Sequence, residues 1–540
     1  MTKDETIFNG YIPAGYGLRI PNNMITTEIE GVYGSEVLKE LGEIIKLYNV
    51  YEKGAEFIYE GTNGDYVAAD LRSMQSAQLI NKEARFLFSK HPDVWVKSKV
   101  DENNETAVKK AKADDTVMQN YIDTVFKKNN FFNKLLKACK DCLIGKRVAC
   151  FINFDEEAQK VQISFAPSLE FVHEVDNDDI DVLTKIVCFF IIKNSNTLTS
   201  QRIYKKKYWL ESGVCYIEEG IYDGTGELVE EITPARATKF TYIPAVVIRN
   251  DGLTGDIEGK SEIDLLKNFE YWQNKLNSAD IDAERKNMNA IRYTVDISPE
   301  STKKENMSTA PGAYWDLSSD QAVENPRSMV GILESSMNYS SPLNATINRV
   351  KSFAYSSVDM PDTSPDAMQG VVTSGKTLKA LYWGLIVRCD EKMQEWRPAI
   401  ERIVNILIDG AKLYPGSIVP YTKDRLPETE YDVIVDNQYS LPEDETEEKG
   451  VDLAEVQAQT MSKRAYMKKW RNLTDKEVEE ELKQIARERE ILENSFMSQE
   501  SFAGAEGVED EDEFLEAEQD TSVEDDIDAL EEELLGDLEV

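Results

Sequence analysis

The sequence predicts an α+β protein of several domains, and three features support this fold class. Its 540 residues are enough for three or four domains with sizeable cores. Residues 147–249 form short β-branched and aromatic segments with a period of two, which indicates an antiparallel sheet or barrel. Helical periodicity precedes and follows this region, and residues 261–287 form an amphipathic segment that would be about 40 Å long as a helix.

The elements follow one another in a defined order. Residues 1–30 are rich in Gly, Pro and Asn and predict an irregular N-terminal arm, and helices are expected at 35–50, 77–88 and across 116–144. The period-two segments run from "RVACFINFD" to "PAVVIRN". After the long helix come two β-like segments, "AIRYTVDIS" and "APGAYWDLSS", and then a helix over 336–357.

The stretch "GVVTSGKT", residues 370–377, matches the phosphate-binding pattern G-x-x-x-x-G-K-[ST] at every position. That pattern binds nucleotide only when the loop follows a buried strand and begins a helix. A long helix is expected after Thr377, either kinked or divided in two by Pro398. The preceding "SSVDMPDTSPDAMQG" contains two prolines and three aspartates and predicts a loop, so we expect a glycine-hinged loop rather than a nucleotide site.

Charge and composition exclude several classes of protein. The formal net charge is −39, and residues 501–540 contain many Asp and Glu and no Lys or Arg, which predicts a disordered acidic tail. A protein that grips DNA needs basic patches, so a sequence-reading DNA binder is disfavoured. Without a long apolar run or a signal-peptide pattern, we expect neither a membrane span nor secretion, and a cytosolic chain.

The Cys and His residues offer little catalytic chemistry. Cys139 and Cys142 form a C-x-x-C pair that could be half a zinc site or a redox pair, but they share a helical face with leucines and are expected in the core. His91 and His173 are the only histidines, which disfavours a histidine-based nucleophilic site. The acidic stretch around His173 lacks the glycine of a calcium loop and predicts a solvated turn. We therefore predict no catalytic residue, metal or cofactor.

Three segments carry a resemblance to a known family: "LINKEARFLFSKHPDV", the block from "PAVVIRNDGLTGDIEGKSEIDLL" to "NSADIDAER", and "SGKTLKALYWGL". With this order of elements, the chain resembles the portal proteins of tailed double-stranded DNA phages, of the long non-contractile-tail type that infects Gram-positive hosts. The resemblance covers about 30–490. The complete phosphate-loop pattern and the acidic extension depart from it, and we interpret the first as accidental.

The resemblance implies a portal fold with a division of the chain into parts. These are an N-terminal arm (1–30), an α/β wing (31–255), a first stem helix (256–288), a small β clip (289–333), a second stem helix (334–357), a tunnel loop (358–375), a long wing helix (376–414), a helical crown (415–490) and the acidic tail (491–540).

Particular residues follow from this division. The tunnel loop and its flank are predicted to line a DNA channel through Val358, Asp359, Met360, Asp362, Asp366, Gly370, Ser374, Gly375, Lys376 and Lys379. The clip is predicted to meet partners through Arg292, Tyr293, Tyr314 and Trp315. Lys376, Lys379 and Arg388 either contact DNA briefly or lie on an exposed helix face.

The implied function is a dodecameric ring at one vertex of the virion capsid, assembled in the host cytoplasm. DNA would pass through it during packaging and ejection without sequence specificity. Its implied partners are the terminase large subunit, the head–tail adaptor, and the major capsid and scaffolding proteins, with no membrane. Two alternatives remain from the residues themselves: a nucleotide-dependent packaging enzyme that uses residues 370–377, and an acidic scaffolding or structural protein.

Overall fold

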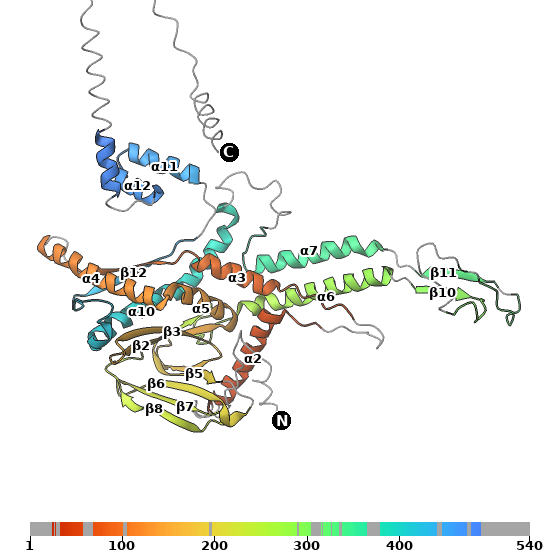
Figure 1. The fold of residues 1–540 in the computed structure, drawn as a ribbon, viewed down its shortest axis with the longest axis horizontal. Coiled ribbons are helices and arrows are strands. Elements are labelled where there is room, and N and C mark those ends of the chain that lie inside the picture. The colour runs from red at the N-terminus through yellow and green to blue at the C-terminus, as the bar shows by residue number, and fades with distance from the viewer. Residues whose placement is uncertain are drawn as a thin grey trace, which may run out of the picture. The chain divides into compact units, whose positions relative to one another are not determined.

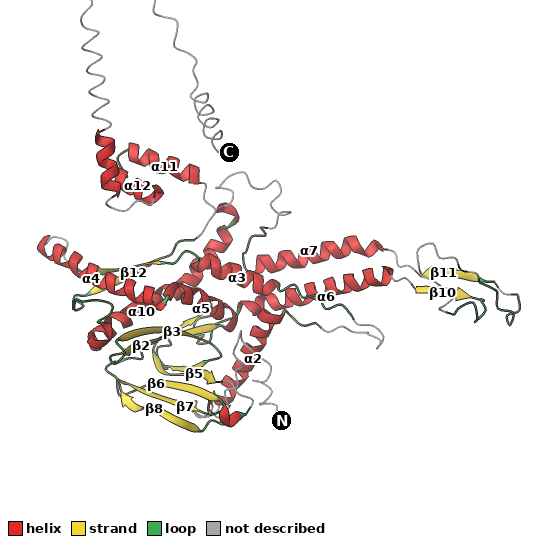
Figure 2. Cartoon of the chain, in the orientation of Figure 1, coloured by secondary structure: helices red, strands yellow, loops and turns green. Residues whose placement is uncertain are grey.

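The computed structural model describes residues 24–25, 28, 33–57, 68–100, 105–193, 197–288, 291–303, 315, 317–325, 327–333, 337–363, 379–439, 445–471 and 477–487. The chain divides into two compact units, Met1–Pro442 and Glu443–Val540, which are treated separately. The first unit contains all the strands of the described chain, and its helices and strands appear in Figures 1 and 2.

Helix α5 packs on a three-stranded sheet in the first unit, and three helices that precede it in the chain contact it. The apolar residues of α5 recur at steps of three and four, so one face of this helix is buried in the main core. This face includes Cys139 and Cys142, and their predicted place in the core is confirmed. The four helices are α2 (Tyr33–Lys53), α3 (Gln75–Phe88), α4 (Glu105–Asn129) and α5 (Phe131–Gly145).

The period-two region forms two antiparallel sheets rather than one. The three-stranded sheet has the order β3–β2–β9, with bounds Lys160–Pro167, Arg147–Asp155 and Ala245–Arg249. The five-stranded sheet runs β4–β5–β6–β7–β8, with bounds Phe171–Val175, Leu183–Lys193, Arg202–Glu211, Val214–Tyr222 and Leu228–Ala237.

Two of these strands were not expected from the sequence. β4 contains His173, which the sequence had assigned to an acidic turn; the turn begins only after Val175. β8 is an edge strand with Pro234 inside it, and all but one of its residues are exposed, so it has no apolar alternation to read.

Helix α10 (Trp383–Leu413) packs against both β2 and β9 and supplies much of the main core. It runs through Pro398 as one helix, so of the two expected outcomes, a kink or a division in two, the division does not occur. Pro398 and Gln394, whose carbonyl loses its helical donor, both lie on the exposed side of the helix, where water can bind the carbonyl. Burial of Trp396, Ile400 and Ile403 on the other side offsets the lost bond.

Two helices run side by side away from the sheets, α6 (Glu262–Met288) and α7 (Ser340–Ser357), as Figure 1 shows. They correspond to the predicted stem helices. Between them in sequence lies a two-stranded ribbon of β10 (Ile291–Val295) and β11 (Met329–Leu333). The strand expected within 310–319 is not the partner of β10; in the described part of that segment, Ser319 makes only a single bridge to Ile297.

The predicted boundary of the crown at residue 415 differs from the structure. β12 (Tyr431–Asp436) pairs antiparallel with β1 (Asp93–Ser98), which assigns it to the first unit. The second unit begins at Glu443 and contains α11 (Glu445–Gln457) and α12 (Lys463–Arg471). Asp452 holds these two helices together, because it accepts a hydrogen bond from the indole of Trp470 at 2.7 Å and pairs with Lys469 at 2.8 Å.

The close packing of α10 on β2 predicts the effect of one methyl group. A Cβ atom at Gly410 would lie 2.0 Å from the ring of Phe154. Gly410→Ala should therefore destabilise the first unit by at least ~1–3 kcal/mol, the usual cost of overpacking a core. Gly450→Ala is the control, since its Cβ would meet nothing within 4 Å on α11. Equal denaturant midpoints for the two variants would contradict this packing.

Candidate functional site

The predicted tunnel loop starts from an anchored base. Just after α7, the side chains of Val358 and Met360 are buried at 1% and 7% exposure, and both join the main core. This burial removes them from the set of side chains available to line a channel. Asp359 between them has a left-handed backbone, with φ of 50°, and an exposed side chain. The base of the loop is therefore fixed by two apolar side chains that flank an outward-facing carboxylate.

Asp362 and Lys379 lie near the two ends of the predicted tunnel loop. Asp362 pairs with Lys351 of α7 at 3.0 Å, so its charge is partly balanced within the chain. Lys379 is exposed. The other predicted channel residues lie outside the described residues: Asp366, Gly370, Ser374, Gly375 and Lys376.

A buried cluster of charges lies directly behind Asp359. Arg388 of α10 donates to Glu83 of α3 at 3.1 Å and to Glu262, the first residue of α6. Lys392, one helical turn later, also donates to Glu262 and to the amide oxygen of Asn250 at 2.8 Å. The guanidinium of Arg388 lies 3.9 Å from Asp359. One cluster therefore joins the loop base, the long helix, a stem helix and the wing.

Electrostatics favour the charged forms of Glu262, Arg388 and Lys392 and disfavour the charged form of Glu83. Burial opposes the ionisation of Glu262, but Lys392 and Arg388 outweigh it and hold the pKa of Glu262 below its ordinary value. Burial, together with the neighbouring charge of Glu262, raises the pKa of Glu83. Burial lowers the pKa values of Arg388 and Lys392, but the two carboxylates raise both above their ordinary values. The two cations and two carboxylates thus compensate one another away from water.

This cluster corrects the expectation for Arg388. The sequence suggested an exposed cation that touches DNA or lies on a free helix face. In the structure its side chain is only 16% exposed and is held by Glu83 and Glu262, so it acts as a structural cross-link.

The surroundings of residues 370–377 do not match a nucleotide site. The segment itself lies outside the described residues, but the described chain before it is helix α7 followed by the loop base, with no strand. The only later strand in the described part of the chain, β12, lies antiparallel in a two-stranded sheet. A phosphate loop requires a strand that leads into it.

The ribbon of β10 and β11 exposes apolar side chains on both of its faces. Val295, Met329, Val330 and Ile332 are between 37% and 53% exposed. The ring of Tyr293 lies over Gly331, where an added Cβ would be 2.4 Å from it. A two-stranded ribbon of this kind has little stability alone, and large exposed apolar groups mark an interaction surface.

The predicted clip residues lie on or near this ribbon. Arg292 lies in β10 opposite Ile332, and its side chain is outside the described part. Tyr293 is 37% exposed and Trp315 is half-buried. Tyr314 lies outside the described residues.

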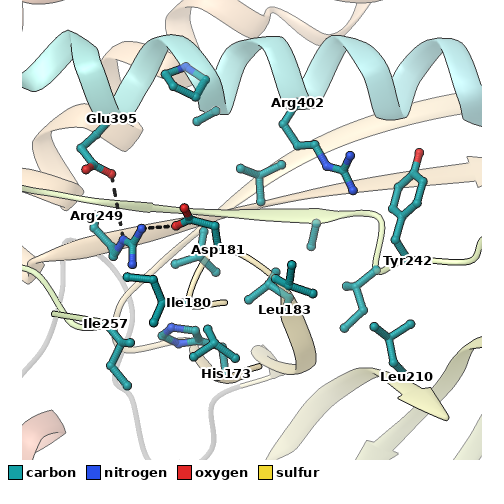
Figure 3. A pocket seen from close by; sticks show the side chains of 18 of the residues that line it. His173, Ile180, Asp181, Leu183, Leu210, Tyr242, Arg249, Ile257, Glu395 and Arg402 are labelled. Atoms are coloured by element: carbon teal, nitrogen blue, oxygen red, sulfur yellow. Dashed lines mark hydrogen bonds and ion pairs between the residues drawn. The ribbon is translucent and has the colours of Figure 1, made fainter. Parts of the chain in front are cut away.

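A pocket of about 510 Å³ lies beneath α10, between β9 and the five-stranded sheet. Figure 3 shows Arg249 between the carboxylates of Asp181 and Glu395, and Arg402 beside Tyr242. Burial and the charge of Arg147 lower the pKa of His173 to about 3, so its imidazole is neutral near pH 7. The charged groups around Arg249 neutralise one another, and the pocket has no nucleophile paired with a base.

The thiols of the C-x-x-C pair are also inert. Burial raises the pKa of Cys139 and of Cys142, which keeps both protonated. Within the described residues no group of three or more His, Cys, Asp or Glu side chains is placed to bind a metal.

The chain combines a body of sheets and helices with two projecting helices and a small β ribbon, a mixed helix-and-strand fold that is consistent with a portal protein of several domains. The chain belongs to the phage portal protein family, SPP1 Gp6-like, whose sequence pattern matches residues 33–493. No curated protein matches it. Portal proteins are structural, form oligomeric rings, and associate with the capsid and terminase at a capsid vertex. No helix in the described part has the length and apolar character of a membrane span.

The buried charge cluster predicts a large effect for one substitution. Arg388→Met keeps the volume of the side chain but leaves Glu83 and Glu262 short of a cation, so the first unit should lose about 3–5 kcal/mol of stability. Lys379→Met, at an exposed position, should change it by less than about 0.5 kcal/mol. Urea unfolding followed by tryptophan fluorescence measures both. Similar midpoints for the two variants would show that the cluster contributes little.

Proposed function

We propose that the protein forms a ring-shaped channel at one vertex of a phage capsid and conducts double-stranded DNA during packaging and ejection. The observation that carries this proposal is the family match over 33–493, together with the projecting helices and the anchored loop. In this proposal the ring is a dodecamer, as in the resemblance, and it assembles in the host cytoplasm before it becomes part of the virion.

The loop after α7 is the proposed constriction of the channel. Its base is anchored by Val358 and Met360, and the chain beyond it leads into α10. The glycines at 370 and 375 supply the backbone freedom that such a movement needs.

The charge of the chain fits a conduit. Each phosphate that a wall neutralises adds affinity through counterion release, and this affinity resists movement. With a net charge of −39 and Asp359 exposed at the loop base, the protein repels DNA weakly and holds it nowhere tightly. Arg388, which would have been the strongest cation near the loop, is neutralised by Glu83 and Glu262.

The ribbon of β10 and β11 is the proposed docking platform. Its exposed apolar side chains suit a partner that completes the small sheet, first the terminase large subunit and then the head–tail adaptor. The remaining surfaces of the ring would meet the major capsid and scaffolding proteins. Residues from Glu443 onward form the proposed crown and acidic tail.

The direct test images the purified protein and measures its mass. A ring of many copies with a central hole is expected, without ATP hydrolysis, and Lys376→Ala should leave both properties unchanged. A nucleotide-dependent packaging enzyme would instead hydrolyse ATP and lose this activity in the variant. A protein that stays monomeric at all concentrations would contradict the proposal.

The loop makes a second prediction. Replacement of Gly370 and Gly375 together by proline should stiffen the loop, so proheads should assemble with normal rings but package or retain less DNA. Gly370→Ala with Gly375→Ala provides the control at the same two positions, because alanine restricts the backbone less than proline does. DNA protected from nuclease in assembled particles is the measurement, and normal packaging and retention in the first variant would place the constriction elsewhere.

A further inference from the structure

Helix α6 has two sides that differ in what covers them. On one side, four polar residues four positions apart form a ladder whose members are at most 1% exposed. Their side chains accept hydrogen bonds from backbone N–H groups of the segment 69–76, which has no regular structure up to Met74 and ends in the first residues of α3. The distances are 3.0 Å from Ser76 to Glu270, 2.9 Å from Ser73 to Asn274, 2.9 Å from Leu71 to Ser278 and 3.0 Å from Ala69 to Asp282.

The ladder fixes the segment mainly through its backbone, although the hydroxyl of Ser73 also donates to Asn274 at 2.9 Å. Leu71 remains 44% exposed although its amide bonds to a fully buried Ser278. One side of α6 is therefore covered by a segment that presents an apolar side chain outward.

The other side of α6 is an apolar stripe that nothing in the described chain covers fully. Leu265 and Trp272 are 47% and 52% exposed, and Leu276, Ala279 and Ala283 continue the same face at helical spacing. Trp272 and Asn274, like Leu276 and Ser278, are two residues apart, and two residues turn a helix by about 200°. The stripe and the ladder therefore lie on opposite sides of α6.

Exposed aromatic side chains also occur on the helices that follow α6. Among the described residues, the exposed Trp and Phe side chains are Trp95, Trp272, Phe353 and Trp383. Three of the four belong to α6, α7 and the start of α10. Exposed aromatic side chains of this kind are typical of buried interfaces.

We infer that, in the ring, the apolar stripe of α6 seats on the segment 69–76 of the next copy. This inference rests on the proposed ring. A closed ring of identical chains requires that one face of each copy meet a different face of its neighbour, and α6 carries two different faces on opposite sides. Leu71 bonds to Ser278, and Leu276 is only about 3 Å from Ser278 along the helix axis. A rotation about a ring axis nearly parallel to α6 therefore brings Leu71 of one copy to Leu276 of the next.

The occupant of the stripe is a second copy because closure of a ring brings a different face of the neighbouring copy onto it. The segment 69–76 offers Leu71 beside Asp70 and Arg72, whose charges pair with each other at 3.0 Å. It therefore presents an apolar group with locally balanced charge to the stripe, where the ammonium group of Lys275 lies over the ring of Trp272. The ladder acts as a positioning device that builds this second face.

Charge placed on the stripe tests the inference. Trp272→Asp should reduce the fraction of protein in rings at least 10-fold at a fixed concentration, with the thermal midpoint of the separated chains unchanged because the site is exposed. Trp95→Asp is the matched control, since Trp95 is 46% exposed on β1, away from the stem. Intact rings in the Trp272→Asp variant would overturn the inference.

Cross-linking identifies the contact directly. All six native cysteines are buried, so thiols introduced by Leu71→Cys and Leu276→Cys should react selectively with a short bis-maleimide. The double variant should give a denaturation-resistant series of multimers, while each single variant should give no products beyond a dimer. Rings of the double variant that yield no such series would overturn the contact. Wild-type protein that forms no ring would instead contradict the proposed function, which keeps the two failures distinct.

Discussion

The architecture depends on a buried cluster of four charges. Arg388 and Lys392 of α10 are held between Glu83 of α3 and Glu262, the residue at which α6 begins. Buried charges are tolerated only when compensated, so the three helices cannot separate at this point without exposing an unpaired ion to a core. The loop base reaches the same cluster through Asp359. The junction of α3, α6 and α10 and the chain just after α7 are thus tied to one cluster.

A second constraint gives α6 its role as a scaffold. Its ladder of Glu270, Asn274, Ser278 and Asp282 satisfies the backbone amides of a segment that has no sheet partner of its own. Bonds to backbone leave most side chains of that segment available for other contacts. One helix can therefore be buried on one side and support an exposed surface on the other. A subunit that meets a neighbour on each side needs two such surfaces.

The lack of a conventional active site is consistent with the family. A match to an eight-residue phosphate-loop pattern depends on a few fixed positions, and its chemistry depends on a preceding strand that the described chain does not have. The pocket beneath α10 pairs Arg249 with acids, and its only imidazole, that of His173, is neutral. The exposed β ribbon, the anchored loop base and the two-sided helix α6 remain as features of the described chain that suit contacts with partners.

The sequence by itself determined the order and type of most elements, because helix and strand periods are local properties of the chain. It predicted the sheet region, the long helix α6 and the burial of Cys139 and Cys142, and it supported the family. It did not reveal that the strands form two sheets, that β12 returns to pair with β1, or that α10 continues through Pro398. It also assigned Arg388 to the surface. These features depend on contacts between residues that are far apart in the chain. A charged residue in a helical pattern, such as Arg388, is predicted to be exposed unless its partners are known, and here these partners come from α3 and α6.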